Sequence, residues 1–167
     1  MRNWVKTFWL SALLVSASHI QMAWANGSSE DEIKAEIQQV LDNYVVAVDT
    51  LDMSVAKSIW SMREDVSFIQ PRGHQKGWED IRDSFYGKAM GSFSVRKLML
   101  HDVNIRVLSD DTAWADFYWD FEATFKDGTP AETTGRETQV FSKEADGWKI
   151  VHIHYSGPAT QREREGF

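Results

Sequence analysis

The sequence predicts an α+β domain in which helices come first and a long, strongly curved antiparallel sheet follows. Apolar residues recur at helical spacing between Ile33 and Val48, so this segment has one apolar face over about five turns. From Phe93 onward the apolar residues recur at every second position, as they do in strands. Helices followed by a run of strands are expected to pack as two layers, with the helices against one face of the sheet.

The first helix is expected to begin at a capping box. In this motif the Ser29 hydroxyl and the Glu32 carboxylate each accept a hydrogen bond from a backbone N–H group that the first turn leaves free. The apolar face that follows consists of Ile33, Ile37, Val40, Leu41, Tyr44, Val45 and Val48.

Two more helices and a short strand precede the change of periodicity. Asp52 is expected to cap a short second helix that runs through Trp60. Residues 66–70 predict a strand, which the Pro-Arg-Gly segment 71–73 stops. A third helix is expected over 78–89.

Four strands are expected after the third helix, separated by turns rich in Asp and Gly. They cover about 93–108, 112–125, 132–143 and 148–155. In the second of them the odd positions are all apolar, while the even positions mix aromatic and acidic residues. The last strand is expected to place Val151, Ile153 and Tyr155 on one face and Trp148, Ile150, His152 and His154 on the other.

Neither of these two strands alternates as cleanly as a sheet with one face in water would. Both faces of the sheet are therefore expected to be covered. The helices would cover one face and a second copy of the chain the other, in a homodimer or a larger homo-oligomer.

The first 25 residues have the features of a signal peptide. Arg2 and Lys6 supply a positive start, an apolar run covers 8–17, and Ala23-Trp24-Ala25 offers a small-x-small cleavage site. The apolar run is shorter than the roughly 20 residues that a membrane span needs, although a retained anchor is the alternative. We expect an exported protein, periplasmic or secreted, and the absence of Cys is compatible with a bacterial periplasm.

Cleavage would leave one domain, 26–160, followed by a charged tail, 161–167. The whole chain carries a net charge of −7, and removal of a basic leader makes the mature part more negative still. Such a surface repels phosphate backbones, so nucleic acid is not an expected partner.

The segment Asp146–Gly157 closely resembles the last strand of the association (hub) domain of calcium/calmodulin-dependent kinase II and of its bacterial SnoaL-like relatives. The tripeptide at 136–138 and the segment Phe68–Gly73 followed by Gly77 add to this resemblance, which covers about residues 30–159. It implies the cone-shaped nuclear transport factor 2-like fold, a deep pocket between the helices and the concave sheet, and a dimer or larger ring.

Ketosteroid isomerase is a catalytic member of the same superfamily, and the resemblance extends to part of its apparatus. Tyr44 resembles its oxyanion-hole tyrosine, and Glu137 lies about where its protonated aspartate would be. Its general base, an aspartate before the proline of the first strand, is replaced by Gln70. An amide does not accept a proton at neutral pH, so isomerisation by that route is not expected.

The kinase hub has pocket arginines that would hold carboxylate ligands. At the matching positions this sequence has Trp119, Gln139 and Tyr155, so the pocket is expected to lack those positive charges and that ligand class. Because no kinase domain precedes the hub-like part, a role as that enzyme's own assembly module is not expected either.

An aromatic pocket with few polar groups is expected on one face of the sheet, as is usual for a small-molecule site. The alternative is that these aromatic residues simply form the core. Strand alternation and the resemblance together name as ligand-binding residues Trp60, Phe68, Phe117, Trp119, Gln139 and Tyr155.

Glu137 is the strongest candidate for a catalytic residue. A carboxylate among aromatic side chains needs a partner or a raised pKa, so Glu137 is either a pocket acid/base or a structural, hydrogen-bonded carboxylate. In the catalytic interpretation Glu137 is the acid/base, and Tyr44 and Gln70 are hydrogen-bond donors that polarise the substrate.

His152 and His154 share a face, and Asp120 or Glu122 could lie across from them. Two histidines and a carboxylate can bind a metal, but a hydrogen-bonded histidine pair is the preferred interpretation. Neither a metal nor a cofactor is therefore expected.

These observations predict an exported protein that binds a small, largely apolar organic molecule. If it is an enzyme, cofactor-free lyase, isomerase or hydratase chemistry is expected. The alternative is a non-catalytic ligand sensor or oligomerisation module, because a fold alone does not decide between these functions.

Overall fold

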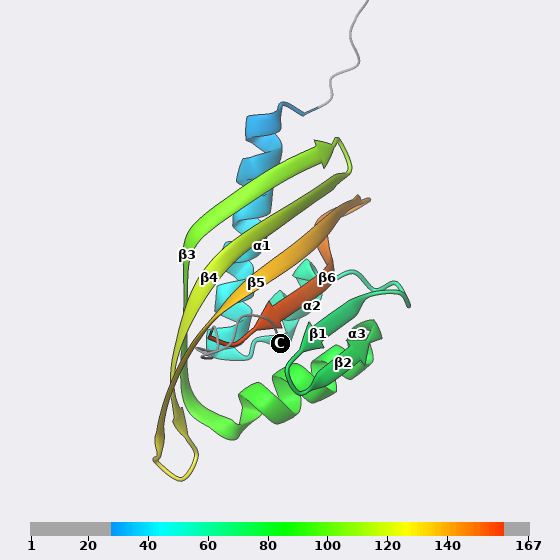
Figure 1. Cartoon of the computed structure of the whole chain (residues 1–167). Coiled ribbons are helices and arrows are strands. Elements are labelled where there is room, and N and C mark those ends of the chain that lie inside the picture. Colours follow the sequence, from blue (N-terminus) through cyan, green and yellow to red (C-terminus); the bar gives the residue numbers. More distant parts are fainter. Residues whose placement is uncertain (1–27, 159–167) are drawn as a thin grey trace, which may run out of the picture.

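The computed structural model describes residues 28–158, so the expected signal peptide and charged tail lie outside the described residues. The order of elements is helices first and strands after, which confirms the α+β prediction (Figure 1). Within the described range, no helix combines the length and the apolar character that a membrane crossing requires.

Three helical regions precede the long strands. Helix α1 spans Glu30–Thr50, α2 spans Met53–Ile59 and α3 spans Gly77–Ile81. The last of these continues as a π-helix over Arg82–Ala89 and a 3-10 turn over Met90–Ser92, so that one bent helical segment occupies the region expected as the third helix.

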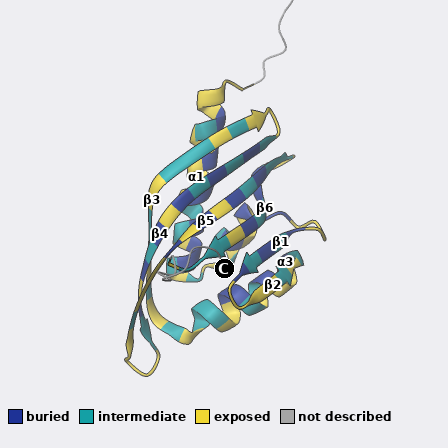
Figure 2. Cartoon of the chain, viewed as in Figure 1, coloured by how far each residue is buried: buried dark blue, intermediate teal, exposed yellow. Residues whose placement is uncertain are grey.

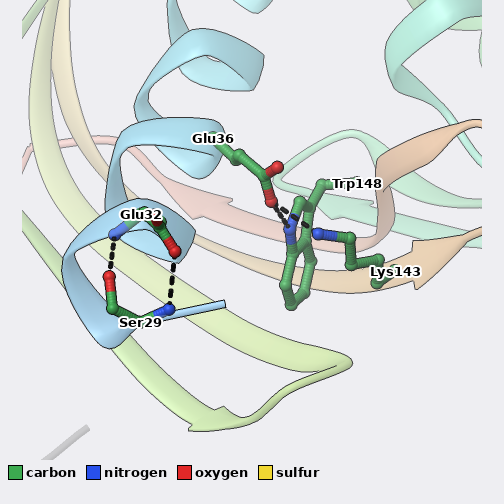
Figure 3. Close-up of polar contacts among 5 residues, drawn as sticks. All are labelled: Ser29, Glu32, Glu36, Lys143 and Trp148. Carbon is green, nitrogen blue, oxygen red and sulfur yellow. Dashed lines mark hydrogen bonds and ion pairs between the residues drawn. The ribbon is translucent and has the colours of Figure 1, made fainter. Parts of the chain in front are cut away.

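The capping box of α1 is present as predicted: Glu32 N–H donates to Ser29 Oγ at 3.2 Å, and Ser29 N–H donates to Glu32 Oε2 at 2.8 Å (Figure 3). At the other end of the helix, the Arg96 guanidinium donates to the Val48 and Asp49 carbonyls, each at 3.2 Å. Both ends of the helix therefore have partners for backbone groups that the helix itself leaves free.

The sheet has six strands in the order β2-β1-β6-β5-β4-β3. Their bounds are β1 Ser67–Gln70, β2 Gly73–Lys76, β3 Phe93–Ser109, β4 Thr112–Phe125, β5 Pro130–Glu144 and β6 Gly147–Ser156. All neighbours are antiparallel except β1 and β6, which pair in parallel. The sheet is therefore mixed, whereas the sequence predicted a purely antiparallel one.

Strand β2 was not predicted from the sequence. It forms a hairpin with β1 in which Ile69 lies opposite His74. Its four residues are polar and mostly exposed, so no apolar alternation marks them as a strand.

A β-bulge in β6 makes one sequence prediction wrong. Val140 pairs with His152 and Phe141 with Ile150, which leaves Val151 without a partner on β5. The extra residue reverses the alternation, so Trp148 and Ile150 face the core together with Ile153 and not the outer face with the histidines. Val151 correspondingly leaves the pocket face.

The core lies between the helices and the concave face of the sheet. Buried and more exposed positions alternate along β4 and β5 (Figure 2). The odd positions of β4, from Ala113 to Ala123, are buried as predicted, and the even positions form the outer face of the sheet.

A polar cluster ties α1 to the end of the sheet. Glu36 Oε2 accepts a hydrogen bond from Trp148 Nε1 and one from Lys143 Nζ, both at 2.7 Å, and the Lys143 ammonium lies over the Trp148 ring (Figure 3). The cluster joins the first turns of α1 to β5 and β6.

Candidate functional site

A cavity of about 370 Å³ lies between the helices and the concave face of the sheet. Its walls are mostly apolar and include Phe85, Met90, Phe93, Leu98, Phe121 and Phe125. The exposed Glu132 and Thr133 line it too, and six further polar groups reach it from α1, from the end of β1 and from the middle of the sheet: Tyr44, Gln70, Arg72, Trp119, Glu137 and Tyr155. Five of these six are residues that the sequence placed in the site.

Glu137 lies on β5 and is 5% exposed. Gln139 Nε2 donates a hydrogen bond to its Oε1 at 2.7 Å. Burial raises the pKa of the Glu137 carboxyl to about 8, and the Gln139 amide and the nearby Tyr44 hydroxyl oppose only part of that rise. Near neutral pH this carboxyl therefore holds its proton in most molecules and can donate as well as accept one.

Tyr44 comes from the buried face of α1, opposite Glu137. Burial and the neighbouring Glu137 carboxyl raise the pKa of its hydroxyl well above the ordinary value. The hydroxyl therefore stays protonated and acts as a hydrogen-bond donor or acceptor, not as a base.

Gln70 ends β1 and takes part in a chain of hydrogen bonds across three strands. The Tyr155 hydroxyl donates to Gln70 Oε1 at 2.8 Å, and Gln70 Nε2 donates to Gln75 Oε1 at 2.9 Å. This chain fixes the orientation of the Gln70 amide and uses one of its two N–H bonds, which leaves one for a ligand.

Four residues expected to bind ligand do not line the cavity. Trp60 is buried and donates from Nε1 to the Tyr86 hydroxyl at 3.0 Å. Phe68 packs edge-on against Phe85, Phe117 is buried in the sheet, and Gln139 lies behind Glu137 as its hydrogen-bond donor. These residues support the cavity walls from behind. They were expected in the site because the sequence pattern indicates which face a residue lies on but not its distance from the cavity.

Four further pocket residues were not predicted from the sequence: Arg72, Phe85, Phe93 and Phe125. Arg72 follows β1 and reaches the cavity, so the pocket has a positive charge at a position other than the three matched to the hub arginines. The Phe residues belong to the third helical region and to strand ends, and only their common location in three dimensions brings them together.

The two histidines of β6 lie on the outer face of the sheet. His152 Nδ1 is 2.7 Å from Ser67 Oγ, and His154 is exposed. Asp120 pairs with His101 and Glu122 with Lys97 instead of lying across from them. Over residues 28–158 no group of three or more His, Asp or Glu side chains has an arrangement that could hold a metal ion.

Comparison with known proteins agrees with the resemblance described from the sequence. Residues 37–160 match the profile of the SnoaL-like domain. No protein with a curated function matches the sequence.

Among solved structures, a nuclear transport factor 2-like superfamily protein from Salmonella enterica serovar Typhimurium superposes with a TM-score of 0.79 at 40% identity, over 83% of this chain and 100% of that one. The association domain of CaMKII from C. elegans superposes with a TM-score of 0.62 at 19% identity, over 76% and 97% of the two chains. A hexachlorocyclohexane dehydrochlorinase from Novosphingobium barchaimii gives 0.66 at 16% identity, over 75% and 86%. These superpositions confirm the predicted nuclear transport factor 2-like fold.

Proposed function

The chain belongs to the SnoaL-like family, and we propose that its cavity binds a small, largely apolar organic molecule on which Glu137 acts as a general acid or base. The observation that carries this proposal is a buried carboxyl that lines the cavity and whose pKa, about 8, lies close to neutral pH. Groups with pKa values near the working pH transfer protons most effectively in both directions.

The composition of the cavity supports the class of ligand. Large apolar side chains form most of its wall, and among its polar groups Tyr44 lies beside Glu137 while Tyr155 hydrogen-bonds Gln70. Small-molecule sites have this character, since the apolar wall supplies affinity and a few placed polar groups supply orientation.

The arrangement supports cofactor-free proton-transfer chemistry, such as a lyase, isomerase or hydratase reaction. Tyr44 would hydrogen-bond an oxygen of the substrate while Glu137 moves a proton. One structural neighbour is a dehydrochlorinase, and dehydrochlorination is an elimination that also removes a proton from carbon. Gln70, held by Tyr155 and Gln75, would orient the substrate without taking up the proton.

The test begins with the protein purified from its own host, whose bound molecule is identified by mass spectrometry and by its density in a crystal. Turnover of that molecule is then compared in the wild type, in Glu137→Gln and in Glu132→Gln, which alters an exposed carboxylate at the cavity. Glu137→Gln should keep the fold and the affinity but reduce turnover by about 10²-fold or more, the usual value of a positioned acid or base. Equal turnover in all three proteins would contradict the catalytic role.

A non-catalytic ligand sensor or oligomerisation module is the second candidate. It is favoured by Gln70, an amide at the position where the isomerase relatives of the family have a carboxylate base. In that case the wild type would release the bound molecule unchanged, and Glu137→Gln would alter affinity by about 1 kcal/mol, the value of one hydrogen bond.

We also propose that the protein is an exported homodimer. On the outer face of the sheet Tyr118 is 52% exposed and stacks on His101. A groove of about 250 Å³ on the same face is lined by groups including Arg136 and His154. A second copy of the chain would cover this face, and removal of the leader would release the protein into the periplasm or the medium.

A further inference from the structure

Gln139 is a buried amide whose side chain has one polar partner among residues 28–158, the Glu137 carboxyl. Gln139 has no exposed surface, and its Nε2 donates to Glu137 Oε1 at 2.7 Å. The carbonyl oxygen of the same amide, Oε1, is buried without a hydrogen-bond partner in that range. An apolar side chain of the same size would avoid this cost, so the presence of an amide at this position needs an explanation.

The neighbouring positions of the sheet do not supply that explanation. Gln139 pairs with Ala115 on β4 and with Ile153 on β6, and both are fully buried apolar residues. Phe141, the next residue of β5 on the same face, is fully buried as well. Because the packing around it is apolar, the amide is accounted for by its contact with Glu137.

The titratable groups that face Glu137 are three tyrosine hydroxyls. They come from Tyr44 on α1, Tyr86 in the π-helix and Tyr155 on β6. Burial raises the pKa of each hydroxyl, so all three stay neutral while Glu137 titrates. Over residues 28–158 no charged side chain contributes to the pKa of Glu137, which leaves burial and the hydrogen-bond donors to decide it.

The two donors beside Glu137, Gln139 and Tyr44, differ in their access to a ligand. Tyr44 lines the cavity, and its hydroxyl hydrogen can turn toward a ligand by rotation about the C–O bond. Gln139 lies behind Glu137 without lining the cavity, so its N–H group remains with the carboxyl when a ligand binds. The same N–H binds the anion more strongly than the neutral acid, because hydrogen bonds to charged groups are the stronger ones.

We propose that Gln139 is a positioning residue whose amide N–H holds one oxygen of the Glu137 carboxyl in both protonation states and sets the pH range over which the other oxygen exchanges its proton. The inference rests on the proposed function and adds to it a residue that touches no ligand. It also explains the unpaired Gln139 carbonyl oxygen, since the N–H that Glu137 needs cannot be supplied without the rest of the amide.

The test compares the wild type with two variants of the full protein. Gln139→Met keeps a side chain of similar length but has no N–H group to donate. Ile153→Val is the matched control, because it loosens the core directly beside Gln139 and leaves the hydrogen bond in place. The Glu137 carboxyl is titrated in each protein by carbon-13 NMR.

A functional readout uses 5-nitrobenzisoxazole, a small aromatic probe that reports on a base in an apolar cavity. The Glu137 carboxylate would take up the proton from the carbon beside the ring nitrogen. The C–H electrons form the nitrile, the N–O bond breaks, and the oxygen keeps its electron pair as a coloured phenolate. Because only ionised Glu137 accepts the proton, the rate should rise with pH through the pKa of Glu137.

The wild-type and Ile153→Val titrations should share a midpoint near pH 8. Gln139→Met should raise the midpoint by about one to two pH units, the effect of losing a hydrogen bond to a charged group. Its rate with the probe should therefore fall by about fivefold or more at pH 8 and recover at higher pH, whereas a purely structural defect would lower the rate at every pH.

The wild type gives an independent readout even if Gln139→Met folds poorly. The signals of the Gln139 side-chain N–H groups should move as Glu137 loses its proton, with the same midpoint as the carboxyl. If these signals do not change with pH, or if Gln139→Met titrates like the wild type, the inference about Gln139 is wrong and the proposed function stands. If Glu137→Gln converts the probe as fast as the wild type, the proposed base is wrong, while the NMR titrations still decide the role of Gln139.

Discussion

At the scale of single residues, the site depends on a carboxyl that the fold keeps out of water. Glu137 has an amide donor at 2.7 Å from Gln139 but, among residues 28–158, no cationic partner that would stabilise its anion. Desolvation therefore dominates, and the neutral acid is the form that the folded state prefers.

Titration of Glu137 by carbon-13 NMR should give a pKa of about 8, against an ordinary value near 4.5. Between these two values the folded chain binds more protons than the unfolded chain, so the free energy of unfolding should fall as the pH rises from about 4.5 to about 8. The stability of Glu137→Gln, measured from melting curves, should not show this fall with rising pH. A Glu137 pKa near 4.5 would contradict both the buried environment and the catalytic hypothesis.

Gly135→Ala should distort the cavity although Gly135 does not line it. The added methyl group overlaps the Trp119 ring and the Ser156 carbonyl, so the indole or the β5–β6 ladder must move. We expect a loss of stability of about 1–3 kcal/mol by overpacking, measured by urea denaturation, and weaker binding of any cavity ligand. Gly87→Ala is the control, because this exposed glycine has no positive φ and the nearest atom to the new methyl group is the Arg82 carbonyl oxygen at 3.4 Å. Equal stability of the two variants would show that the space at Gly135 is not needed.

Tyr44 and Glu137 could be predicted from the sequence because they lie in recognisable segments, a helix with one apolar face and a strand with regular alternation. Trp60 and Phe68 were expected in the pocket because their chemistry and approximate location fit it. Pattern alone does not show whether an aromatic ring ends at the cavity or one layer behind it. Arg72 was missed for the opposite reason, since a residue beside a turn proline gives no sign of facing a pocket.

At the scale of elements, Glu36 holds α1 against two strands. Its carboxylate is the acceptor for both Lys143 and Trp148 (Figure 3). Since the indole N–H is partly buried, it needs this acceptor more than the Lys143 ammonium, whose side chain is 32% exposed.

Glu36→Ala should lower the free energy of unfolding by about 1–3 kcal/mol, because it leaves the Trp148 N–H without its acceptor. Glu30→Ala is the control, as Glu30 forms only an exposed pair with Lys34, and such pairs contribute at most about 1 kcal/mol. Chemical denaturation of both variants measures the difference. A Glu36→Ala protein as stable as the control would mean that the cluster does not stabilise the domain.

The number and order of the long elements follow from hydrophobic periodicity, and the helices and long strands were predicted close to their observed bounds. The bulge at Val151 could not be predicted, because one extra residue leaves the composition and the turn signals unchanged. It nevertheless moves the side chains of the preceding β6 residues to the opposite face of the sheet. Strand β2 and the parallel pairing of β1 with β6 depend on contacts between distant segments, which a local pattern does not encode.

At the scale of the whole molecule, the outer face of the sheet is the surface where a second copy would bind. Light scattering at micromolar concentration should give the mass of a dimer or a larger assembly. Tyr118→Asp should shift the protein toward the monomer because it places a charge in the proposed interface, whereas Asp110→Lys, in the exposed β3–β4 turn, should not. A stable wild-type monomer would exclude this arrangement.

The proposal that the protein is exported leads to a separate prediction about the N-terminus of the mature chain. Intact mass of the protein recovered from its host should correspond to a chain that begins at Asn26, after the Ala23-Trp24-Ala25 site. A chain that retains Trp9 would indicate a membrane anchor in place of a cleaved leader.

The parallel pairing of β1 with β6 also has a consequence for how the chain folds. This pairing brings together Gln70 and Tyr155, which are 85 positions apart in the sequence. The chain must therefore lose the conformational entropy of a long loop before the contacts between the two strands can stabilise it. The β1–β2 hairpin is too small to persist alone, and it can dock only after β6, the last strand of the described chain, has been synthesised. We therefore expect the two halves of the Gln70–Tyr155 wall to meet in a late folding step, so that a nascent chain has no binding cavity until β6 has formed.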